Sequence, residues 1–351
     1  MPHHGEAATG IEQHSKHWLI QGDEEADRVR VWRDLDDVDA GFGPVVVTIG
    51  NFDGVHLGHR HVLKRTRDVA GDLGDLPVVA VTFDPHPMSV IRPDKAPRQL
   101  TSLESRLELL DSAGVDAVLV LRFDAELADL PAEDFVTDIL LGGLHAQGIV
   151  VGENFRFGHR ALGDIDLLSK MGAPYGVSVV SLPLDGSGDQ TWSSTYIRER
   201  VAEGDVASAA TALGRPFATR GVVVKGEQRG RELGFPTANV PVSSDEVAVP
   251  ADGVYAGWLR RLDVTAALSW PAAISVGTNP TFEGTDRHVE SYVLDRDDLE
   301  LYGARVEVLF VAHLRGMVRF DSGDALIEQM VDDVDRARAL LGAPLPEAPQ
   351  P

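Results

Sequence analysis

Hydrophobic and polar positions follow two different patterns along the chain, and the pattern changes near residue 214. In the first part, short β-branched runs alternate with stretches of helical periodicity. Buried strands are expected at 45–49, 76–83, 117–121, 148–152 and 177–182, and helices at 57–69, 102–113 and 132–141. Strands that alternate with helices predict a parallel sheet with helices on both faces, which is a Rossmann-like α/β domain.

The second part consists of short extended segments separated by turn residues. They lie at 221–224, 254–259, 273–276, 288–294 and 306–312, and they predict an antiparallel barrel or sandwich. A closing helix follows, with Ser322 near its start and Gly342 after its end. Its single apolar face is formed by Leu326, Met330, Val334, Ala337 and Leu341.

These patterns divide the chain into a domain over residues 29–213 and a domain over residues 214–342. Residues 1 to about 40 are polar and lack sustained periodicity, so most of them are expected to be an extension, with 1–28 mobile. The Pro-rich residues 343–351 are expected to be disordered.

Composition excludes several kinds of chemistry. The 351 residues include no cysteine, which excludes disulfides, thiolate nucleophiles and Cys-ligated metals. A net charge of −23 disfavours nucleic acid, which binds largely through Lys and Arg. The sequence shows neither a membrane-length apolar run nor a signal-peptide pattern, so we expect a soluble, cytoplasmic protein without membrane partners. A homo-oligomer stays possible.

The first candidate site is the sequence GNFDGVHLGH at residues 50–59, between the first strand and the first helix. Gly50 and Gly54 allow a tight turn, and His56 and His59 lie on the same side of the helix start. Helix N-termini favour anions, and two imidazoles there can donate hydrogen bonds to phosphate oxygens. The alternative is a pair of surface histidines near an ordinary helix cap. No P-loop pattern occurs in the chain.

The second candidate site is the sequence KGEQRGRELGFPTAN at residues 225–239. Its glycines recur every fourth position, and Lys225, Arg229 and Arg231 make it a cationic loop able to fold over phosphates. The alternative is a long hairpin turn. Thr237 and Asn239 point to the same face if the segment is extended, and their oxygens suit Mg²⁺.

Glu290 lies on a predicted strand and shares a face with His288, Tyr292 and Leu294. A carboxylate in such a position is either a solvated charge or a general base. The pattern alone leaves both open.

The first site resembles the G-x-F-D-x-x-H-x-G-H signature of the nucleotidyltransferase module in prokaryotic bifunctional FAD synthetases. The resemblance continues through FDPHP (83–87), RFD (122–124), GENFRFGHRALG (152–163) and SSTYIR (193–198). The second part is similar to the riboflavin kinase module of the same family through GRPF (214–217), RGRELGFPTAN (229–239), GVYA (253–256), SVGTNPTF (275–282), RHVESYVLD (287–295) and FDS (320–322). In total the resemblance covers roughly residues 30–342.

The resemblance implies a nucleotidyltransferase domain followed by a small antiparallel Greek-key barrel. It also implies two reactions: phosphorylation of riboflavin by ATP to FMN, and adenylylation of FMN by ATP to FAD and pyrophosphate, with Mg²⁺ as cofactor. By the same resemblance, His56, His59 and Arg198 act on ATP phosphates, Thr237 and Asn239 bind Mg²⁺–ATP, and Glu290 is the base. The further nucleotide or flavin contacts that we expect are Gly50, Asn51, Phe52, Asp53, Asn154, Ser193, Ser194, Thr195, Lys225, Gly226, Gly230, Arg231 and Gly234.

Chemistry agrees with one base in the second site and none in the first. The ribityl hydroxyl is a very weak acid, so its attack on phosphorus is helped by a proton acceptor. The FMN phosphate is already largely ionised at neutral pH and needs only alignment and charge neutralisation. Two positions depart from the family pattern: Asn154 stands where many members have Asp, and Pro131 where a capping Ser or Thr is usual.

Two other interpretations compete. One half could be inactive and serve as a flavin-binding or assembly module, to which Asn154 points weakly. The chain could also be a nucleotide sensor or a nucleotidyltransferase that acts on RNA. The charge of −23 argues against RNA, and the candidate Mg²⁺ ligands and base argue against a sensor.

Overall fold

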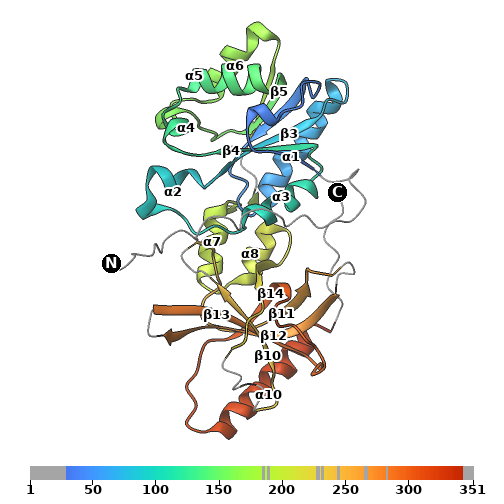
Figure 1. Ribbon diagram of the computed structural model, residues 1–351, viewed down its shortest axis with the longest axis vertical. Coiled ribbons are helices and arrows are strands. Elements are labelled where there is room, and N and C mark those ends of the chain that lie inside the picture. The colour runs from blue at the N-terminus through green and yellow to red at the C-terminus, as the bar shows by residue number, and fades with distance from the viewer. Residues whose placement is uncertain are drawn as a thin grey trace, which may run out of the picture.

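The computed structural model describes residues 29–342 except for 184–185, 188–189, 227–229, 231–232, 243–245, 265–267 and 282–283. Two domains are stacked along the long axis of the molecule, with a pair of helices between them (Figure 1). The predicted extension at 1–28, the predicted tail at 343–351 and Arg231 lie outside the described residues.

The first domain is built on a six-stranded sheet in the order β1-β4-β3-β2-β5-β6, and every neighbouring pair is parallel. The strands are β1 (Arg30–Trp32), β2 (Val45–Ile49), β3 (Val78–Asp84), β4 (Ala117–Arg122), β5 (Ala146–Gly152) and β6 (Ser178–Leu182). The helices are α1 (Leu57–Asp72), α2 (Pro87–Ile91), α3 (Leu103–Asp111), α4 (Ala125–Asp129), α5 (Ala132–Asp134), which continues as a π-helix over Phe135–Gly143, and α6 (Ile165–Gly172). The predicted Rossmann-like fold is confirmed.

Strand β1, which was not predicted as a strand, lies at the start of the predicted domain of residues 29–213. It pairs in parallel with β4, and Asp34 caps a short 3₁₀ turn at Leu35–Asp37. The ring of Trp32 is 5% exposed and packs edge-on against Phe42, with ring centroids 4.7 Å apart. The burial of this ring is what fixes a polar segment to the edge of the sheet.

The order of the strands places the first candidate site at the centre of the sheet. From β2 the chain builds β3 and β4 on one side, and later β5 and β6 on the other. The loop after β2 therefore lies where the strand order reverses, and ligands of open α/β sheets bind there, outside the carboxyl ends of the strands.

The second domain is a nearly closed antiparallel barrel in the order β10-β13-β12-β11-β14-β9. Its strands are β9 (Phe217–Val222), β10 (Thr237–Val242), β11 (Gly253–Arg261), β12 (Leu268–Thr281), β13 (Gly284–Val293) and β14 (Arg305–Arg315). The edges β9 and β10 approach each other where Val224 donates a backbone hydrogen bond of 2.8 Å to Asn239. The predicted barrel is confirmed.

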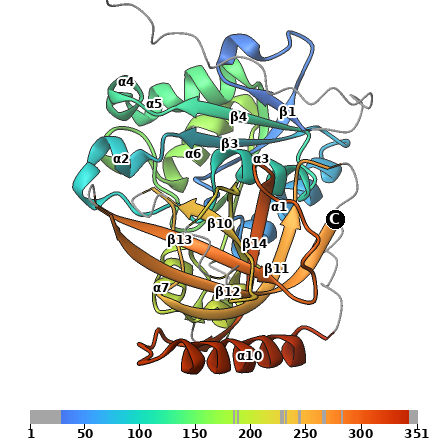
Figure 2. The ribbon, with the colours of Figure 1, turned by 60° about the horizontal axis from the view of Figure 1, so that its bottom comes forward.

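The predicted closing helix is α10 (Gly323–Leu340), capped by Ser322. It runs along the outside of the barrel (Figure 2). Val334, Ala337 and Leu341 are buried against the barrel, as the spacing of its apolar positions predicts. No helix in the described part of the chain is both long enough and apolar enough to span a membrane.

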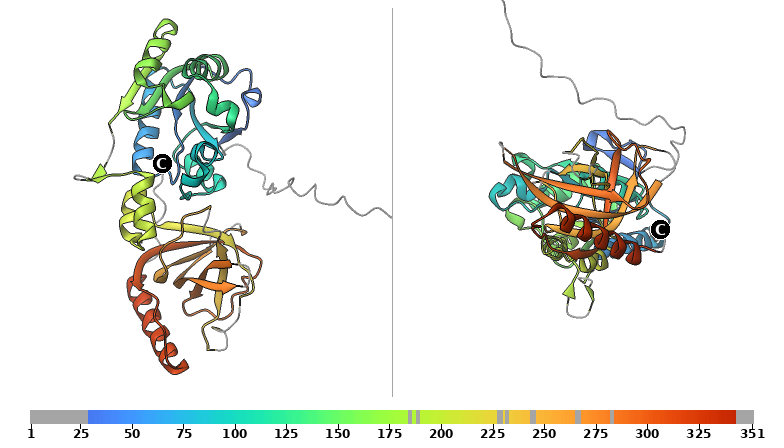
Figure 3. Two further views of the ribbon diagram at one scale, coloured as in Figure 1. Left: turned by 90° about the vertical axis from the view of Figure 1, so that its left-hand side faces the viewer. Right: turned by 90° about the horizontal axis from the view of Figure 1, so that it is seen from below.

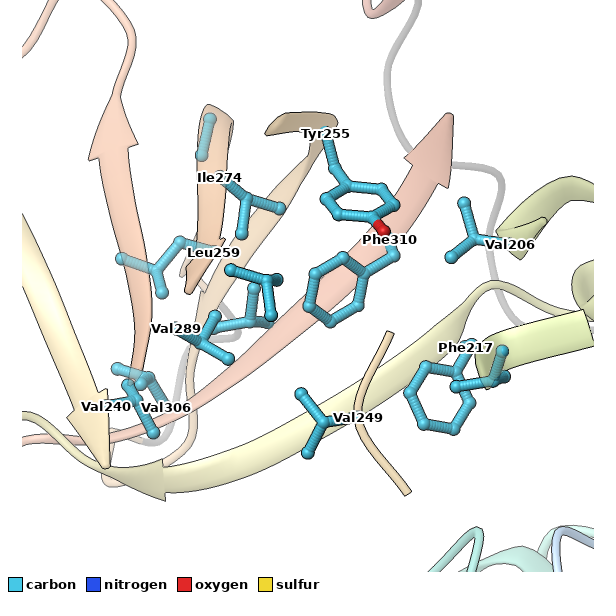
Figure 4. Close-up of a cluster of buried hydrophobic side chains, with 14 of the residues drawn as sticks. Val206, Phe217, Val240, Val249, Tyr255, Leu259, Ile274, Val289, Val306 and Phe310 are labelled. Carbon is cyan, nitrogen blue, oxygen red and sulfur yellow. The ribbon is translucent and has the colours of Figure 1, made fainter. Parts of the chain in front are cut away.

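Helices α7 (Ser194–Ala202) and α8 (Val206–Leu213) follow a two-residue-strand hairpin, β7 (Gly186–Ser187) and β8 (Gln190–Thr191), and lie between the domains (Figure 3). They precede the predicted domain boundary, yet their apolar side chains belong to the core of the barrel. Val206 of α8 faces Phe310, and Phe217 and Tyr255 belong to the same cluster (Figure 4). The barrel core therefore includes two helices encoded before residue 214.

Direct contacts also join the two domains. Gln99 and Val247 form a backbone bridge, with Gln99 accepting from Ala248 at 2.8 Å. Arg220 of β9 forms an ion pair of 2.7 Å with Glu108 of α3. Backbone and charged contacts therefore both cross the domain boundary.

Candidate active sites

The loop that connects β2 to α1 has an unusual backbone. Phe52, Gly54 and Val55 have φ angles of 47°, 84° and 37°. A left-handed conformation is costly for a β-branched residue such as Val55. At Gly54 a Cβ atom would lie 2.9 Å from Leu100 Cδ1, so this position needs glycine for space as well as for its φ angle.

His56 caps α1 through its ring. Its Nδ1 accepts a hydrogen bond of 3.3 Å from the backbone N–H of His59. The proton of the neutral ring is therefore on Nε2, where it can be donated to a ligand. The pKa of His56 is lowered to about 4, mainly by burial; Asp53 opposes this shift, and Arg215 and Arg198 add to it.

His59 stacks on His56, with ring centroids 3.7 Å apart and an interplanar angle of 22°. Burial, followed by the neighbouring His56, lowers the pKa of His59 well below its ordinary value. Its Nδ1 is buried and has no hydrogen-bond partner in the described part of the chain. The predicted pair of imidazoles is thus brought together, neutral, at the start of a helix of 16 residues.

Asp53 and Arg198 form a buried ion pair of 2.6 Å beneath the loop. The side chain of Asp53 is 1% exposed and also accepts from the backbone N–H groups of Leu100, at 2.9 Å, and Thr101, at 3.1 Å. Arg198 Nε donates to the carbonyl of Arg98 at 2.7 Å. Asp53 was predicted to contact nucleotide; this geometry favours a role in holding the loop.

Two serines of the SSTYIR segment have different structural roles. Ser193 caps α7 by accepting from Tyr196 at 3.2 Å, and the Ser194 hydroxyl donates to the Asp53 carbonyl at 2.8 Å. A Cβ atom at Gly58 would lie 3.6 Å from the carbonyl of Trp192, so the first turns of α1 and α7 are adjacent. Two helix N-termini converge beside the histidines, and both favour an anion there.

The other predicted contacts of this domain lie at the same edge of the sheet. Gly50 and Asn51 directly follow β2, and the exposed Asn154 follows the neighbouring strand β5. Thr195 is exposed in the first turn of α7, whereas Phe52 is 2% exposed and packs edge-on against His59.

In the barrel, the structure brings Thr237, Asn239 and Glu290 together. Asn239 of β10 is the direct register partner of Glu290 of β13. Thr237 Oγ1 lies 3.5 Å from Glu290 Oε2 and accepts a hydrogen bond of 3.1 Å from Asn239 Nδ2. Direct partners on antiparallel strands share a face, so these three side chains form one constellation.

Two cavities meet at this constellation. A cavity of about 60 Å³ is lined by Gly226, Asn239 and Arg296, and a larger one of about 300 Å³ by Glu290. Thr237 lines both. Most of the lining of the larger cavity is apolar and comes from Leu233, Phe235, Val254, Ile274, Met317, Val318, Phe320, Leu326 and Met330.

The glycines of the predicted phosphate loop each have a steric reason. A Cβ atom at Gly226 would lie 2.5 Å from Asn239 Oδ1, and one at Gly230 would lie 2.5 Å from the carbonyl of Phe235. Gly234 has a φ angle of 87°. Lys225 is exposed beside Gly226. At Gly226 there is therefore no room for a side chain beside Asn239.

Comparison with known proteins agrees with this pair of sites. Family models match in the same order, FAD synthetase over residues 40–196 and riboflavin kinase over residues 213–341. The bifunctional riboflavin kinase/FMN adenylyltransferase of Escherichia coli K12 is 39% identical over 301 residues, which cover 86% of this chain and 94% of that protein. The chain belongs to the bifunctional riboflavin kinase/FMN adenylyltransferase family. Both catalytic domains of the family are present, and with them riboflavin kinase and FMN adenylyltransferase activity.

Relatives from other bacteria extend the similarity. The family members of Pseudomonas fluorescens and Listeria monocytogenes are 40% and 36% identical, each over 84% of this chain and over 92% and 91% of their own lengths. A solved structure from Streptococcus pneumoniae, described as a macrolide-efflux protein, is 30% identical with a TM-score of 0.77, and covers 88% of this chain and 98% of that one. The arrangement of two joined domains is therefore shared over nearly the full length.

The donor atoms of the kinase domain suit the Mg²⁺ that the family implies. Thr237 and Asn239 supply neutral oxygens, and Mg²⁺ prefers a few such ligands together with phosphates and water. The hydroxyl of Ser291 is buried, lines the smaller cavity and has no hydrogen-bond partner in the described residues. A group of three or more His, Asp or Glu side chains suited to a metal does not occur in that part of the chain.

Sequence reasoning missed several side chains around the adenylyltransferase site. His86 Nε2 lies 3.4 Å from Asn51 Nδ2, although the FDPHP motif by itself indicates only the resemblance to the family. Arg106 is 1% exposed and donates to the Phe83 carbonyl at 3.1 Å. Arg215 donates to the Gly54 carbonyl at 2.7 Å. A charged residue at a core position of a helix, as with Arg106, is the kind of signal that could have found them.

Proposed function

We propose that the barrel domain transfers the γ-phosphoryl group of ATP to the ribityl hydroxyl of riboflavin at the constellation of Thr237, Asn239 and Glu290. The ATP phosphates reach the cavity of about 60 Å³, and the flavin ring system occupies the cavity of about 300 Å³. The observation that carries this assignment is that Thr237 lines both cavities. Donor and acceptor then meet at one side chain, as an in-line transfer requires.

The proposed chemistry assigns one role to each group. The Glu290 carboxylate takes the proton of the ribityl hydroxyl as the oxygen attacks the γ-phosphorus. Thr237 and Asn239 would hold Mg²⁺ there, and the ion would supply positive charge that offsets the negative charge on the departing ADP. The glycines at 226, 230 and 234 let the loop cover the phosphates with backbone N–H groups.

For the first domain, we propose that His56 and His59 align the phosphates of ATP while the FMN phosphate attacks the α-phosphorus. Each neutral ring can donate one N–H to the pyrophosphate that leaves. Arg198 Nη1 makes no hydrogen bond within the described residues, so it can reach a phosphate while Nη2 holds Asp53. The attacking phosphate is already ionised, so no general base takes part.

The proposed partners and location follow from the same chemistry. A net charge of −23 supports small nucleotides and flavins as ligands rather than nucleic acid. We place the reactions in the cytoplasm, and a homo-oligomer stays a prediction. We propose that the adenylyltransferase domain ends at residue 213 and that the kinase domain begins at residue 214.

Two variants test the assignment of the reactions to the sites. With riboflavin and Mg²⁺–ATP, Glu290→Gln should lower FMN formation by about 100-fold or more, while adenylylation of supplied FMN continues. His59→Ala should do the reverse. FMN and FAD are separated and quantified by chromatography, and chelation of Mg²⁺ should stop FMN formation in the wild type. Normal FAD synthesis by His59→Ala, or loss of both activities in Glu290→Gln, would overturn the assignment.

A further inference from the structure

The kinase domain begins with a short segment that packs against the adenylyltransferase loop. Leu213 lies against Gly54, since a Cβ atom there would be 3.4 Å from Leu213 Cδ2. A Cβ atom at Gly214 would lie 2.6 Å from Leu57 Cδ2, at the start of α1. Arg215 then extends its guanidinium under the loop itself. We call Leu213–Arg215 the brace.

Arg215 binds the loop through backbone carbonyls alone. Its Nη2 donates to the Gly54 carbonyl at 2.7 Å, and its Nη1 lies 3.4 Å from the Val55 carbonyl. No carboxylate of the described residues lies within ion-pair distance of this guanidinium. Burial, followed by the nearby Arg60, lowers the pKa of Arg215 to about 10, so the group stays charged at neutral pH.

These contacts act where the backbone is strained. The carbonyl of Asp53 is held by the Ser194 hydroxyl at 2.8 Å, and the N–H of Gly54 by Thr101 Oγ1 at 3.1 Å. Arg215 holds the next two carbonyls. A left-handed valine persists only when its surroundings over-determine it, and Val55 directly precedes the cap residue His56.

We propose that Arg215, a residue of the kinase domain, is a positioning residue for FMN adenylylation, because it holds the loop in the conformation that presents His56 and His59. This inference rests on the proposed assignment of adenylylation to that loop. FMN adenylylation then depends on a residue of the kinase domain. Riboflavin phosphorylation should not depend on Arg215, because Arg215 does not contact Thr237, Asn239 or Glu290.

The test compares three full-length variants. Arg215→Met removes both the charge and the forked contact, and Arg215→Lys keeps the charge but can reach only one carbonyl at a time. Arg220→Met is the matched control, since Arg220 crosses the same domain interface to Glu108 without contacting the loop. Steady-state kinetics are measured for FMN adenylylation and for riboflavin phosphorylation in each variant.

Arg215→Met should lower kcat for adenylylation by about 10- to 100-fold, as loss of alignment does, and leave riboflavin phosphorylation within about twofold. Arg215→Lys should recover part of the loss. Arg220→Met should keep adenylylation near the wild-type rate. Equal losses of adenylylation in the Arg215 and Arg220 variants would overturn the proposal, because loosened domain packing would then explain both. Unchanged adenylylation in Arg215→Met would also overturn it.

A spectroscopic readout tests whether the charge of Arg215 lies beside His56 in solution. The His56 ring is influenced by Asp53, Arg198 and Arg215, and the charge of Arg215 lowers its pKa. NMR titration of the His56 ring should show a higher pKa in Arg215→Met and a nearly unchanged pKa in Arg215→Lys. An unchanged His56 pKa in Arg215→Met would count against the proposal. His59→Ala is assayed beside these variants. If His59→Ala makes FAD at the normal rate, the site assignment fails. If His59→Ala is impaired and Arg215→Met makes FAD at the normal rate, only the proposal for Arg215 fails.

Discussion

The buried pair of Asp53 and Arg198 offers a test of what the signature aspartate does. We consider the single changes Asp53→Asn and Arg198→Met and the double variant. Each single change removes one charge and leaves the other buried. In the double variant neither charge remains, and the introduced amide oxygen can still accept from the N–H groups of Leu100 and Thr101 that Asp53 binds now.

The expected magnitude follows from burial. Asp53 is 1% and Arg198 18% exposed, and removal of one partner of a buried pair costs about 3–5 kcal/mol. The remaining exposure of Arg198 and the backbone donors to Asp53 favour the lower end, about 3 kcal/mol for each single variant. The double variant should lose less than the sum of the two, with a coupling energy of about 2 kcal/mol.

The assay is urea denaturation of the four full-length proteins, with FAD synthesis measured in parallel. Stability should be partly recovered in the double variant, but FAD synthesis should not be, because the Arg198 guanidinium, which we propose contacts the phosphates, is absent. Losses that add to within about 0.5 kcal/mol would show that the two charges do not act as a pair. Native stability of Arg198→Met would refute the reasoning outright.

Two further predictions concern pH and domain structure. Between pH 6.5 and about 4 the unfolded chain protonates His56 while the folded chain keeps it neutral, so the free energy of unfolding should fall by up to about 3 kcal/mol as the pH drops through this window. In His56→Asn the free energy of unfolding should change less steeply with pH, and an identical pH dependence would contradict the lowered pKa. A fragment of residues 192–342 should make FMN and melt at a higher temperature than a fragment of residues 214–342. The reason is that each large side chain of α7 and α8 removed from the barrel core costs roughly 1.5–3 kcal/mol of stability. Equal melting temperatures would show that the two helices do not stabilise the barrel.

The central strands of the first sheet were largely predictable because they are nearly continuous apolar runs, and α10 was predictable because it has one apolar face. The exceptions have physical causes. Strand β1 is three residues long and lies at the sheet edge, so a single buried ring, Trp32, gives its only signal. The apolar faces of α7 and α8 indicate burial, but periodicity does not say which domain a helix packs against.

The sequence predicted which residues gather at each candidate site better than it predicted the direction of their side chains, and the role of each residue stays a prediction. Spacing placed Thr237 and Asn239 on one strand face, and the register of β10 and β13 added Glu290. The sequence could not show that Asp53 turns into the protein, since a carboxylate in a glycine loop can face either a ligand or a buried arginine. Arg215 was hidden for the same reason: its partners are carbonyl groups, which leave no mark in the sequence.

The apolar lining of the larger barrel cavity has a consequence for unproductive hydrolysis. Water is the most abundant competitor for the γ-phosphoryl group, and an enzyme with an open acceptor site consumes ATP without product whenever water is ordered there. Side chains such as Phe235, Met317 and Leu326 offer such water few hydrogen-bond partners. If this surface binds the flavin ring system as we propose, it also limits the loss of nucleotide until that ring system has bound.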